Sequence, residues 1–156
     1  MTLDVSTSSS SFIGRPPAVV FDFVTRPRNW VGTHPVTEDV RFSGGDARAT
    51  TGDEFVETIG GGGQPGFDVR WRVTVHEIDR LWVIETDALG DPDVSCRIQY
   101  EFEPDGTGTM FRRHMTISYP AAESTGRAYR VPPEGASDPD VHDRYIETVK
   151  RRLESP

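Results

Sequence analysis

One long helical pattern, residues 138–153, constrains the fold more than any other part of the chain. Its apolar residues recur at helical spacing and form one stripe: Val141, Tyr145, Ile146, Val149 and Leu153. Asp138 and Pro139 suit the start of a helix, and the cations at 150–152 suit its negative C-terminal end. An amphipathic helix must bury its stripe, and almost everything from 36 to 119 alternates with the two-residue period of strands. We therefore predict a curved antiparallel sheet wrapped around this helix.

Length and composition indicate a soluble, single-domain protein spanning residues 1–156. The chain is long enough for one hydrophobic core, with 35% hydrophobic residues and a mean hydropathy of −0.51. No apolar run reaches membrane-spanning length, and residues 1–14 lack the basic and apolar parts of a signal peptide. We therefore expect a cytoplasmic protein without stable membrane insertion. Cys96 is the single cysteine, which excludes an internal disulfide.

The charge balance argues against nucleic acid as a partner. The 25 acidic residues outnumber the 17 lysines and arginines, for a formal net charge of −8. A duplex-binding domain normally carries a basic stripe instead. Metal binding is not expected either, because no histidine has ligand spacing with a cysteine or carboxylate; the four are His34, His76, His114 and His142. The oligomeric state stays open, and a homodimer is compatible with the sequence.

Strand patterns fill most of the chain. Residues 3–13 alternate loosely and predict a first strand. Pro16 and Pro17 then open a short helix that Pro27 ends, and Arg28–His34 predict a second helical piece. Six further strands are predicted, at Val36–Ser43, Asp53–Ile59, Phe67–Ile78, Leu81–Ala88, Val94–Glu103 and Thr109–Tyr119. The turns between them are short and rich in glycine, proline and aspartate: 44–46, 60–63, 79–80, 90–92 and 104–106. Neighbouring strands should therefore pair antiparallel as a meander.

The alternation also assigns two faces to the sheet, one apolar and one charged. In the strand at 67–78 the inward set is Phe67, Val69, Trp71, Val73 and Val75, and the outward set is Asp68, Arg70, Arg72, Thr74 and His76. In the last strand the inward set is Phe111, Arg113, Met115, Ile117 and Tyr119. Such a sheet is covered on one face only.

The order of elements, together with the residues PPAVVFDFVTRPRNWVGTHP at 16–35, resembles the SRPBCC superfamily. Asn29 and Trp30 before the second strand and the turn at 104–109 belong to the same resemblance. It implies an α+β helix-grip fold: a bent seven-stranded antiparallel sheet around the C-terminal helix, with a hydrophobic cavity between them. Members are START-like lipid carriers, sensors, cyclases or dehydratases of the polyketide cyclase type, all without a cofactor. Membership alone therefore leaves the function open.

The segment at 121–137 is longer than the corresponding connection in many members. It contains two glycines, two consecutive prolines and the lone aromatic Tyr129. Loops of this length are usually functional or mobile. We therefore predict that it covers or borders the mouth of the cavity and is among the more mobile parts of the chain.

Arg113 is the residue on which the functional interpretation depends. It lies among apolar inward residues, and a buried guanidinium needs a carboxylate, a water or a ligand because it cannot lose its charge. One interpretation is an anchor for an anionic or carbonyl-bearing ligand. The alternative is a structural salt bridge to Glu57, whose own parity places it inward between Phe55 and Ile59. Both interpretations stay open at this stage.

Other candidate binding residues share these inward faces. Trp30 and His34 flank the entry to the second strand, where the resemblance implies one mouth of the cavity; His34 could transfer protons or simply hydrogen-bond a backbone carbonyl. The remaining candidates for the cavity wall are Phe55, Trp71, Trp82, Tyr100, Met115, Ile117, Tyr145 and Val149, and the aromatic ones among them could equally be ordinary core.

Three functions remain for such a protein. The first is binding of a small or medium hydrophobic or aromatic molecule in the central cavity. The second is a cyclase or dehydratase in which Arg113 polarises a carbonyl while His34, Glu57 or Tyr145 moves protons. The third is a regulatory or structural module whose interior is filled. An open cavity with several convergent titratable groups would favour the enzyme, and an almost wholly apolar one the carrier.

Overall fold

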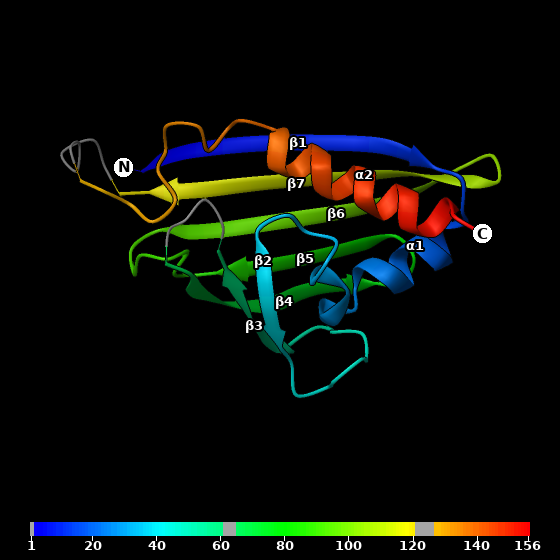
Figure 1. Ribbon diagram of the computed structural model, residues 1–156, viewed down its shortest axis with the longest axis horizontal. Helices are drawn as coiled ribbons and strands as arrows, with labels where there is room; N and C mark the ends of the chain where they lie inside the picture. Colours follow the sequence, from blue (N-terminus) through cyan, green and yellow to red (C-terminus); the bar gives the residue numbers. More distant parts are fainter. Residues whose placement is uncertain (1, 61–64, 121–126) are drawn as a thin grey trace.

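The computed structural model describes residues 2–60, 65–120 and 127–156. The elements in chain order are β1 (Leu3–Ile13), α1 (Pro17–Val24), the 3₁₀ helix η1 (Pro27–Trp30), β2 (Thr37–Arg41), β3 (Glu54–Ile59), β4 (Phe67–Glu77), β5 (Leu81–Thr86), β6 (Ser95–Asp105), β7 (Gly108–Tyr119) and α2 (Asp140–Glu154). The strands form one antiparallel sheet in the order β1-β7-β6-β5-β4-β3-β2. The predicted meander from β2 to β7 is confirmed, and β1 adds to its free edge (Figure 1).

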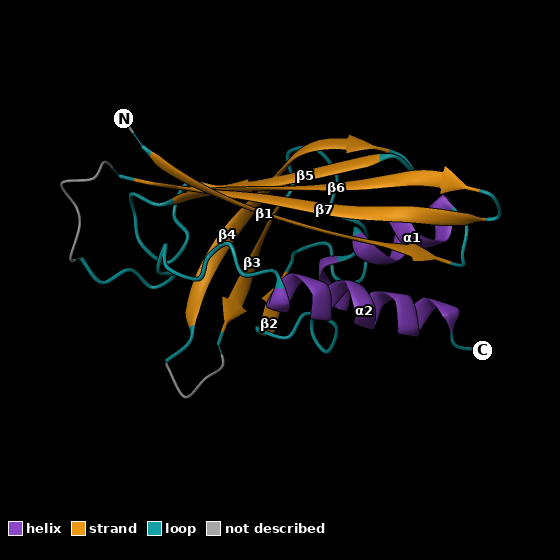
Figure 2. Ribbon diagram, turned by 90° about the horizontal axis from the view of Figure 1, so that it is seen from above, coloured by secondary structure: helices purple, strands orange, loops and turns teal. Residues whose placement is uncertain are grey.

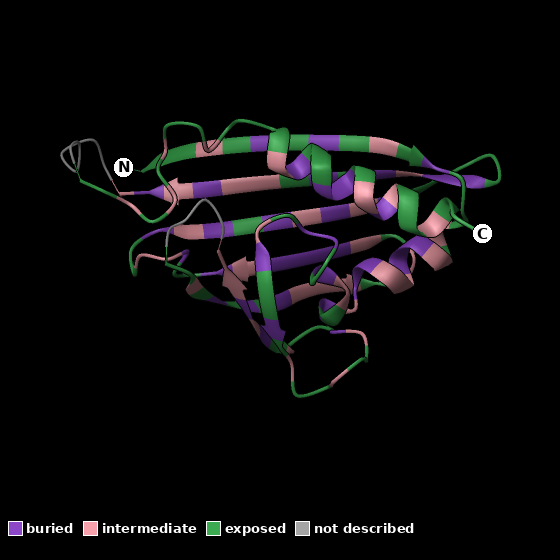
Figure 3. Cartoon of the chain, in the orientation of Figure 1, coloured by how far each residue is buried: buried purple, intermediate pink, exposed green. Residues whose placement is uncertain are grey.

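The sheet bends around α2. Seen from above, β2, β3 and β4 turn away from the longer strands toward the side on which α2 lies (Figure 2). One stripe of α2 faces the sheet and contains its buried residues His142, Tyr145, Ile146 and Val149, while the opposite side is exposed (Figure 3). Val141 and Leu153 of the predicted stripe are half-buried. The predicted helix-grip fold is confirmed.

Several element ends differ from the predicted ones. The helix expected from Asp138 begins at Asp140, and Asp138 instead accepts a hydrogen bond on Oδ1 from the Asp140 N–H at 3.0 Å. The helical piece expected at 28–34 is η1, which begins at Pro27 and ends at Trp30. The strand ends also shift by one or two residues, and β2 is the most shortened. Element ends depend on local caps and pairing, so alternation alone does not fix them. Residues 61–63 of one predicted turn lie outside the described residues.

A β-bulge in β4 corrects one predicted face. The pairing of β4 with β5 shifts between Val73 and Val75, so that His76 lies opposite the buried Trp82. An extra residue in one strand reverses the alternation that follows it. His76 therefore turns inward, where its ring lies 5.2 Å from that of Phe21, and the prediction of an outward His76 was wrong.

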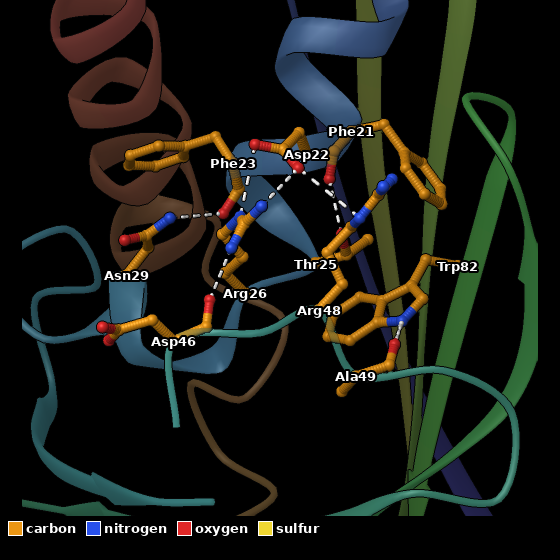
Figure 4. A network of polar contacts seen from close by, with 10 residues as sticks. All are labelled: Phe21, Asp22, Phe23, Thr25, Arg26, Asn29, Asp46, Arg48, Ala49 and Trp82. Atoms are coloured by element: carbon orange, nitrogen blue, oxygen red, sulfur yellow. Dashed lines mark hydrogen bonds and ion pairs between the residues drawn. The ribbon is translucent and has the colours of Figure 1, made fainter. Parts of the chain in front are cut away.

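A polar network fixes α1 and η1 against the sheet (Figure 4). Arg26 donates to Asp22 at 2.9 Å and to the Asp46 carbonyl at 2.6 Å, which ties the end of α1 to the loop before β3. The Trp82 indole donates to the Ala49 carbonyl of the same loop at 2.9 Å. Asn29 donates to the Phe23 carbonyl, also at 2.9 Å. Because η1 is held in this way, the residues that follow it have fixed positions at one end of the sheet.

No helix of the described residues is long and apolar enough to cross a membrane.

Candidate functional site

A cavity of about 230 Å³ lies between the bent sheet and the N-terminal half of α2. Most of its wall is apolar, and its polar side chains are Trp30, His34, Glu57, Trp71, Arg113, Asp138 and His142. The apolar residues come from three strands, from the loops before β2 and after β5, from the segment before α2 and from α2 itself: Val36, Ile59, Leu89, Ile98, Met115, Ile117, Val131, Ala136 and Val141. The interior is therefore open, which argues against the filled module.

Arg113 is buried inside this cavity, with 3% of its surface exposed. Its Nε donates to the Tyr100 hydroxyl at 3.3 Å, Nη1 donates to His142 Nδ1, and Nη2 donates to His34 Nε2 at 3.4 Å. None of the ion pairs among the described residues includes Arg113. The predicted alternative of an Arg113–Glu57 salt bridge was therefore wrong. A guanidinium has more N–H donors than these three partners use, so some remain for a ligand.

Both histidines beside Arg113 are held neutral. Burial, followed by the charge of Arg113, lowers the pKa of His142 to about 4 and holds the pKa of His34 well below its ordinary value. Because Arg113 donates to one ring nitrogen of each histidine, that nitrogen must carry a lone pair, and the proton sits on the other nitrogen. His34 Nδ1 is thus an N–H donor, and it has no partner among the described residues.

Glu57 is a second buried polar group in the cavity wall. It is 2% exposed, and it accepts hydrogen bonds from the Thr37 hydroxyl at 2.5 Å and from the Trp71 indole at 3.0 Å. Burial raises the pKa of the Glu57 carboxyl above its ordinary value, while these two donors and Arg113 partly offset the rise. Glu57 is therefore a carboxylate of increased basicity at the edge of an apolar space.

Two further buried polar atoms near the cavity have no partner within the described part of the chain, the Trp30 indole nitrogen and the Tyr145 hydroxyl. The Tyr145 ring lies 5.0 Å from the ring of His34, and the Arg113 guanidinium lies 5.4 Å from the Tyr145 ring centre. Burial keeps Tyr145 protonated by holding its pKa well above the ordinary value. Buried donors without partners cost free energy, and the two of them whose residues line the cavity, Trp30 and His34, suit a ligand that supplies acceptors.

The structure brings together seven of the twelve side chains predicted for the site. Trp30, His34, Glu57, Trp71, Arg113, Met115 and Ile117 line the cavity. The other five are buried in the core around it: Phe55, Trp82, Tyr100, Tyr145 and Val149. Tyr100 still bears on the site through its hydroxyl, which accepts from Arg113.

Sequence reasoning missed His142 as a site residue. It lies one helical turn before Tyr145, so it shares the face that the apolar stripe turns toward the sheet. Its spacing was a usable signal, but the residue is polar and was not counted in the stripe. The cavity residues from the loops, Leu89 and Val131, have no periodic signal that could have found them.

The segment before α2 borders the cavity, as predicted. Its Val131, Gly135 and Ala136 line the wall. Its contacts to the sheet and to the loop after β5 include the Tyr119 hydroxyl, which donates to the Val131 carbonyl at 2.7 Å, the Thr7 hydroxyl, which donates to the Ala136 carbonyl at 2.8 Å, and the Arg130 N–H, which donates to Asp91 at 2.8 Å. Residues 121–126 of the predicted segment lie outside the described residues, and its mobility stays a prediction.

In residues 2–60, 65–120 and 127–156, no group of three or more histidine, cysteine, aspartate or glutamate side chains is placed to hold a metal ion. Cys96 is buried, and burial raises the pKa of its thiol to about 12, so it is not a thiolate near neutral pH.

We predict that His142→Gln makes the protein more resistant to acid. The native pKa of about 4 lies below the ordinary 6.5, so the unfolded chain binds the proton more tightly and His142 destabilises the fold as pH falls from 6.5 to 4. Glutamine can still accept from Arg113 but does not titrate. Urea unfolding at pH 7 and at pH 4.5 gives the free energy of unfolding at each pH. Between them, it should fall by about 2 kcal/mol more in the wild type than in the variant.

An equal loss in both proteins would contradict the buried neutral His142. His114→Gln is the matched control, because His114 lies on the exposed face of β7 and contacts Ser8 there.

The fold and the cavity define a helix-grip protein with a ligand-sized internal space. Residues 4–153 match the family described as polyketide cyclase/dehydrase and lipid transport, and the chain belongs to this family. The resemblance to the wider SRPBCC superfamily is thereby confirmed.

Similar proteins include one of Penicillium ochrochloron named penitrem biosynthesis cluster 1 protein I. It is 36% identical over 148 residues, covering 91% of this chain and 92% of that protein. Among solved structures, Ara h 8.0201 superposes with a TM-score of 0.67 at 14% identity, over 99% of this chain and all of that one. The di-domain ARO/CYC BexL from the BE-7585A biosynthetic pathway has a TM-score of 0.73 at 14% identity, over 99% of this chain and 51% of its own.

Proposed function

We propose that this protein binds a small hydrophobic molecule bearing a carbonyl group in the central cavity, and that it catalyses proton transfer next to that carbonyl. The observation that carries the proposal is Arg113: a buried guanidinium in a mostly apolar space, with spare N–H donors and no ion pair among the described residues.

Arg113 is suited to polarise the carbonyl of such a ligand. A carbonyl oxygen placed against its spare N–H groups becomes more negative as an adjacent C–H bond breaks, and a fixed cation in a water-poor site stabilises that charge strongly. Arg113 would hold an enolate oxygen through these N–H groups, while the His34 Nδ1–H, on the ring nitrogen turned away from Arg113, is a separate donor without a partner among the described residues.

Glu57 is the best candidate for the base. In the observed arrangement each histidine uses its lone pair to accept from Arg113, so neither has a free lone pair to take a proton. Glu57 keeps carboxylate lone pairs beyond its bonds to Thr37 and Trp71, and burial raises its pKa toward the neutral range in which a base is most effective. A proton taken from carbon by Glu57 and a negative charge collected by Arg113 amount to enolisation, the first step of an aldol-type cyclisation or of a dehydration.

The family and the relatives support this direction. The family description names polyketide cyclase and dehydrase activity, and BexL is an ARO/CYC from a biosynthetic pathway. A second candidate is a carrier without catalysis, which the largely apolar wall favours and which agrees with the words lipid transport in the same description. A carrier would use Arg113 as an anchor and would leave Glu57 idle.

A pair of matched probes tests the binding step. We expect 2-acetylnaphthalene to bind more tightly than 2-ethylnaphthalene by about 1.5–3 kcal/mol, because the two differ mainly in the carbonyl and a hydrogen bond to a charged group is worth that much. Ile98→Trp, which fills the cavity from β6, should abolish binding of both probes while leaving the thermal transition cooperative. Fluorescence titration measures all four combinations.

Equal affinities for ketone and hydrocarbon would refute the role of Arg113, and binding of neither would refute the cavity as a ligand site. The base is tested separately with 5-nitrobenzisoxazole, a small aromatic compound that opens when a carboxylate removes its ring proton. Turnover should fall by about 100-fold or more in Glu57→Gln. Unchanged turnover in that variant would leave the carrier as the function.

A further inference from the structure

A second hollow of about 460 Å³ lies between the residues that follow η1 and the exposed side of α2. Its walls are the turn at 32–35, Thr37, and the exposed side of α2 with Arg144, Glu147, Thr148 and Arg151. Unlike the central cavity, this outer hollow is lined mainly by polar side chains and has no part in the proposed binding of a hydrophobic ligand.

The outer hollow and the central cavity share a wall. His34 lines both spaces. Thr37 lines the outer hollow and donates its hydroxyl proton to Glu57 Oε2 at 2.5 Å, and Glu57 in turn lines the central cavity. A continuous polar contact therefore crosses the wall at Thr37–Glu57. The first residue of β2 and the fourth of β3 make this contact: the bulge between Thr37 and Asp39 places Thr37 opposite Ile59, two residues along β3 from Glu57.

Apolar residues of the segment before α2 and of α2 form another part of the cavity wall. Val131, Gly135, Ala136 and Val141 line the cavity, and a hydrophobic molecule bound against them would exclude water from the cavity space next to Glu57. A base that takes a proton from a ligand must return it to solvent before the next turnover. Proton exchange between Glu57 and solvent through the central cavity would have to wait for the ligand to leave.

We propose that Thr37 is a proton relay that connects Glu57 to solvent in the outer hollow while a ligand occupies the central cavity. The proposal rests on the proposed role of Glu57 as base. In the discharging direction the Glu57 Oε2–H proton passes to Thr37 Oγ, and the Thr37 hydroxyl proton passes to a water molecule in the outer hollow. In the charging direction a solvent acid protonates Thr37 Oγ as the hydroxyl proton moves to the Glu57 carboxylate. Each direction moves one proton and leaves Thr37 unchanged.

Thr37 is thus a positioning residue, and its substitution should alter the rate of proton exchange more than the fold. Thr37→Val keeps the branched shape on β2 and removes the hydroxyl. Thr37→Ser keeps the hydroxyl and removes a methyl group, so it is the matched control. The readout is the rate at which the Glu57 carboxyl group gains and loses its proton. It is measured by NMR relaxation of the carboxyl carbon at the midpoint of the Glu57 titration, and the signal is assigned by its absence in Glu57→Gln.

The measurement is made with 2-acetylnaphthalene saturating the central cavity. We expect fast exchange in the wild type and in Thr37→Ser, and exchange slowed by about 100-fold or more in Thr37→Val, the size of effect that a positioned proton-transfer group produces. A wild-type rate in Thr37→Val overturns the relay, and so does arrest of exchange in the wild type when the probe binds. If the probe does not bind, the proposed function fails. The relay is then decided in the empty protein, where equal rates in wild type and Thr37→Val overturn it.

Discussion

A chain truncated before residue 140 is expected to lose its cooperative thermal transition and to become aggregated or molten. Tyr145, Ile146 and Val149 are almost wholly buried against the sheet, and each large apolar side chain contributes about 1.5–3 kcal/mol on burial. Their sum is comparable with the whole stability of a typical domain, about 5–15 kcal/mol. Truncation also exposes the apolar wall of the cavity. Circular dichroism melting and binding of a hydrophobic dye measure the outcome.

The control for this truncation is a chain ending at Glu154. It lacks only the exposed Ser155 and Pro156, which follow the end of α2, so it should melt like the parent. A soluble protein ending at residue 139 with a cooperative transition near that of the parent would show that α2 is an appendage rather than the centre of the grip.

Periodicity was sufficient for the architecture because one face of each element is buried. The stripe of α2 and the alternation in β4, β6 and β7 each reflect a single apolar partner layer, so the pattern and the environment agree. The alternation also placed Arg113 and Glu57 on inward faces, and both are buried. The same rule failed at His76, because a bulge changes the parity of a strand without changing its composition.

The interior arrangement of the site was less accessible to sequence reasoning. Parity shows that two side chains share a face but gives no distance between them, so Arg113 and Glu57 could be expected to pair. The structure instead gives Glu57 two neutral donors from β2 and β4, and gives Arg113 two neutral histidines and a tyrosine hydroxyl. His142 lines the cavity because of its position on the inward face of α2. The loop residues line it because of the path of the chain, which no local sequence pattern encodes.

Arg113→Met is expected to weaken binding of 2-acetylnaphthalene by about 10- to 100-fold, the equivalent of a lost charge-assisted hydrogen bond. Affinity for 2-ethylnaphthalene should not change, because that probe makes no hydrogen bond. The variant should nevertheless be about as stable as the wild type at pH 7, or slightly more stable. A buried charge is expensive to desolvate, and no ion pair among the described residues offsets that cost for Arg113. The lost bonds to Tyr100 and the histidines act in the opposite direction.

The stability of this variant also decides between the two original interpretations of Arg113. If Arg113 and Glu57 were coupled as a buried ion pair, Arg113→Met would cost roughly 3–5 kcal/mol, and Glu57→Met in the same chain would restore most of it. The structure predicts no such rescue, because Glu57 is already held by Thr37 and Trp71. Denaturant unfolding of the two single variants and the double variant gives the coupling energy directly.

Acid stability supplies the last and most specific test of Arg113. Its charge is the second cause, after burial, that depresses the pKa of both His34 and His142. Removing the charge should move both native pKa values upward, toward the ordinary 6.5. Each histidine then destabilises the fold less as pH falls below 6.5, since the native state now binds its proton more readily. Between pH 7 and pH 4.5 the free energy of unfolding should therefore fall by about 1–2 kcal/mol less in Arg113→Met than in the wild type. This difference should vanish in a background where both histidines are glutamine. If it persisted there, its source would be another group, and the cluster of one cation between two neutral histidines would be disproved.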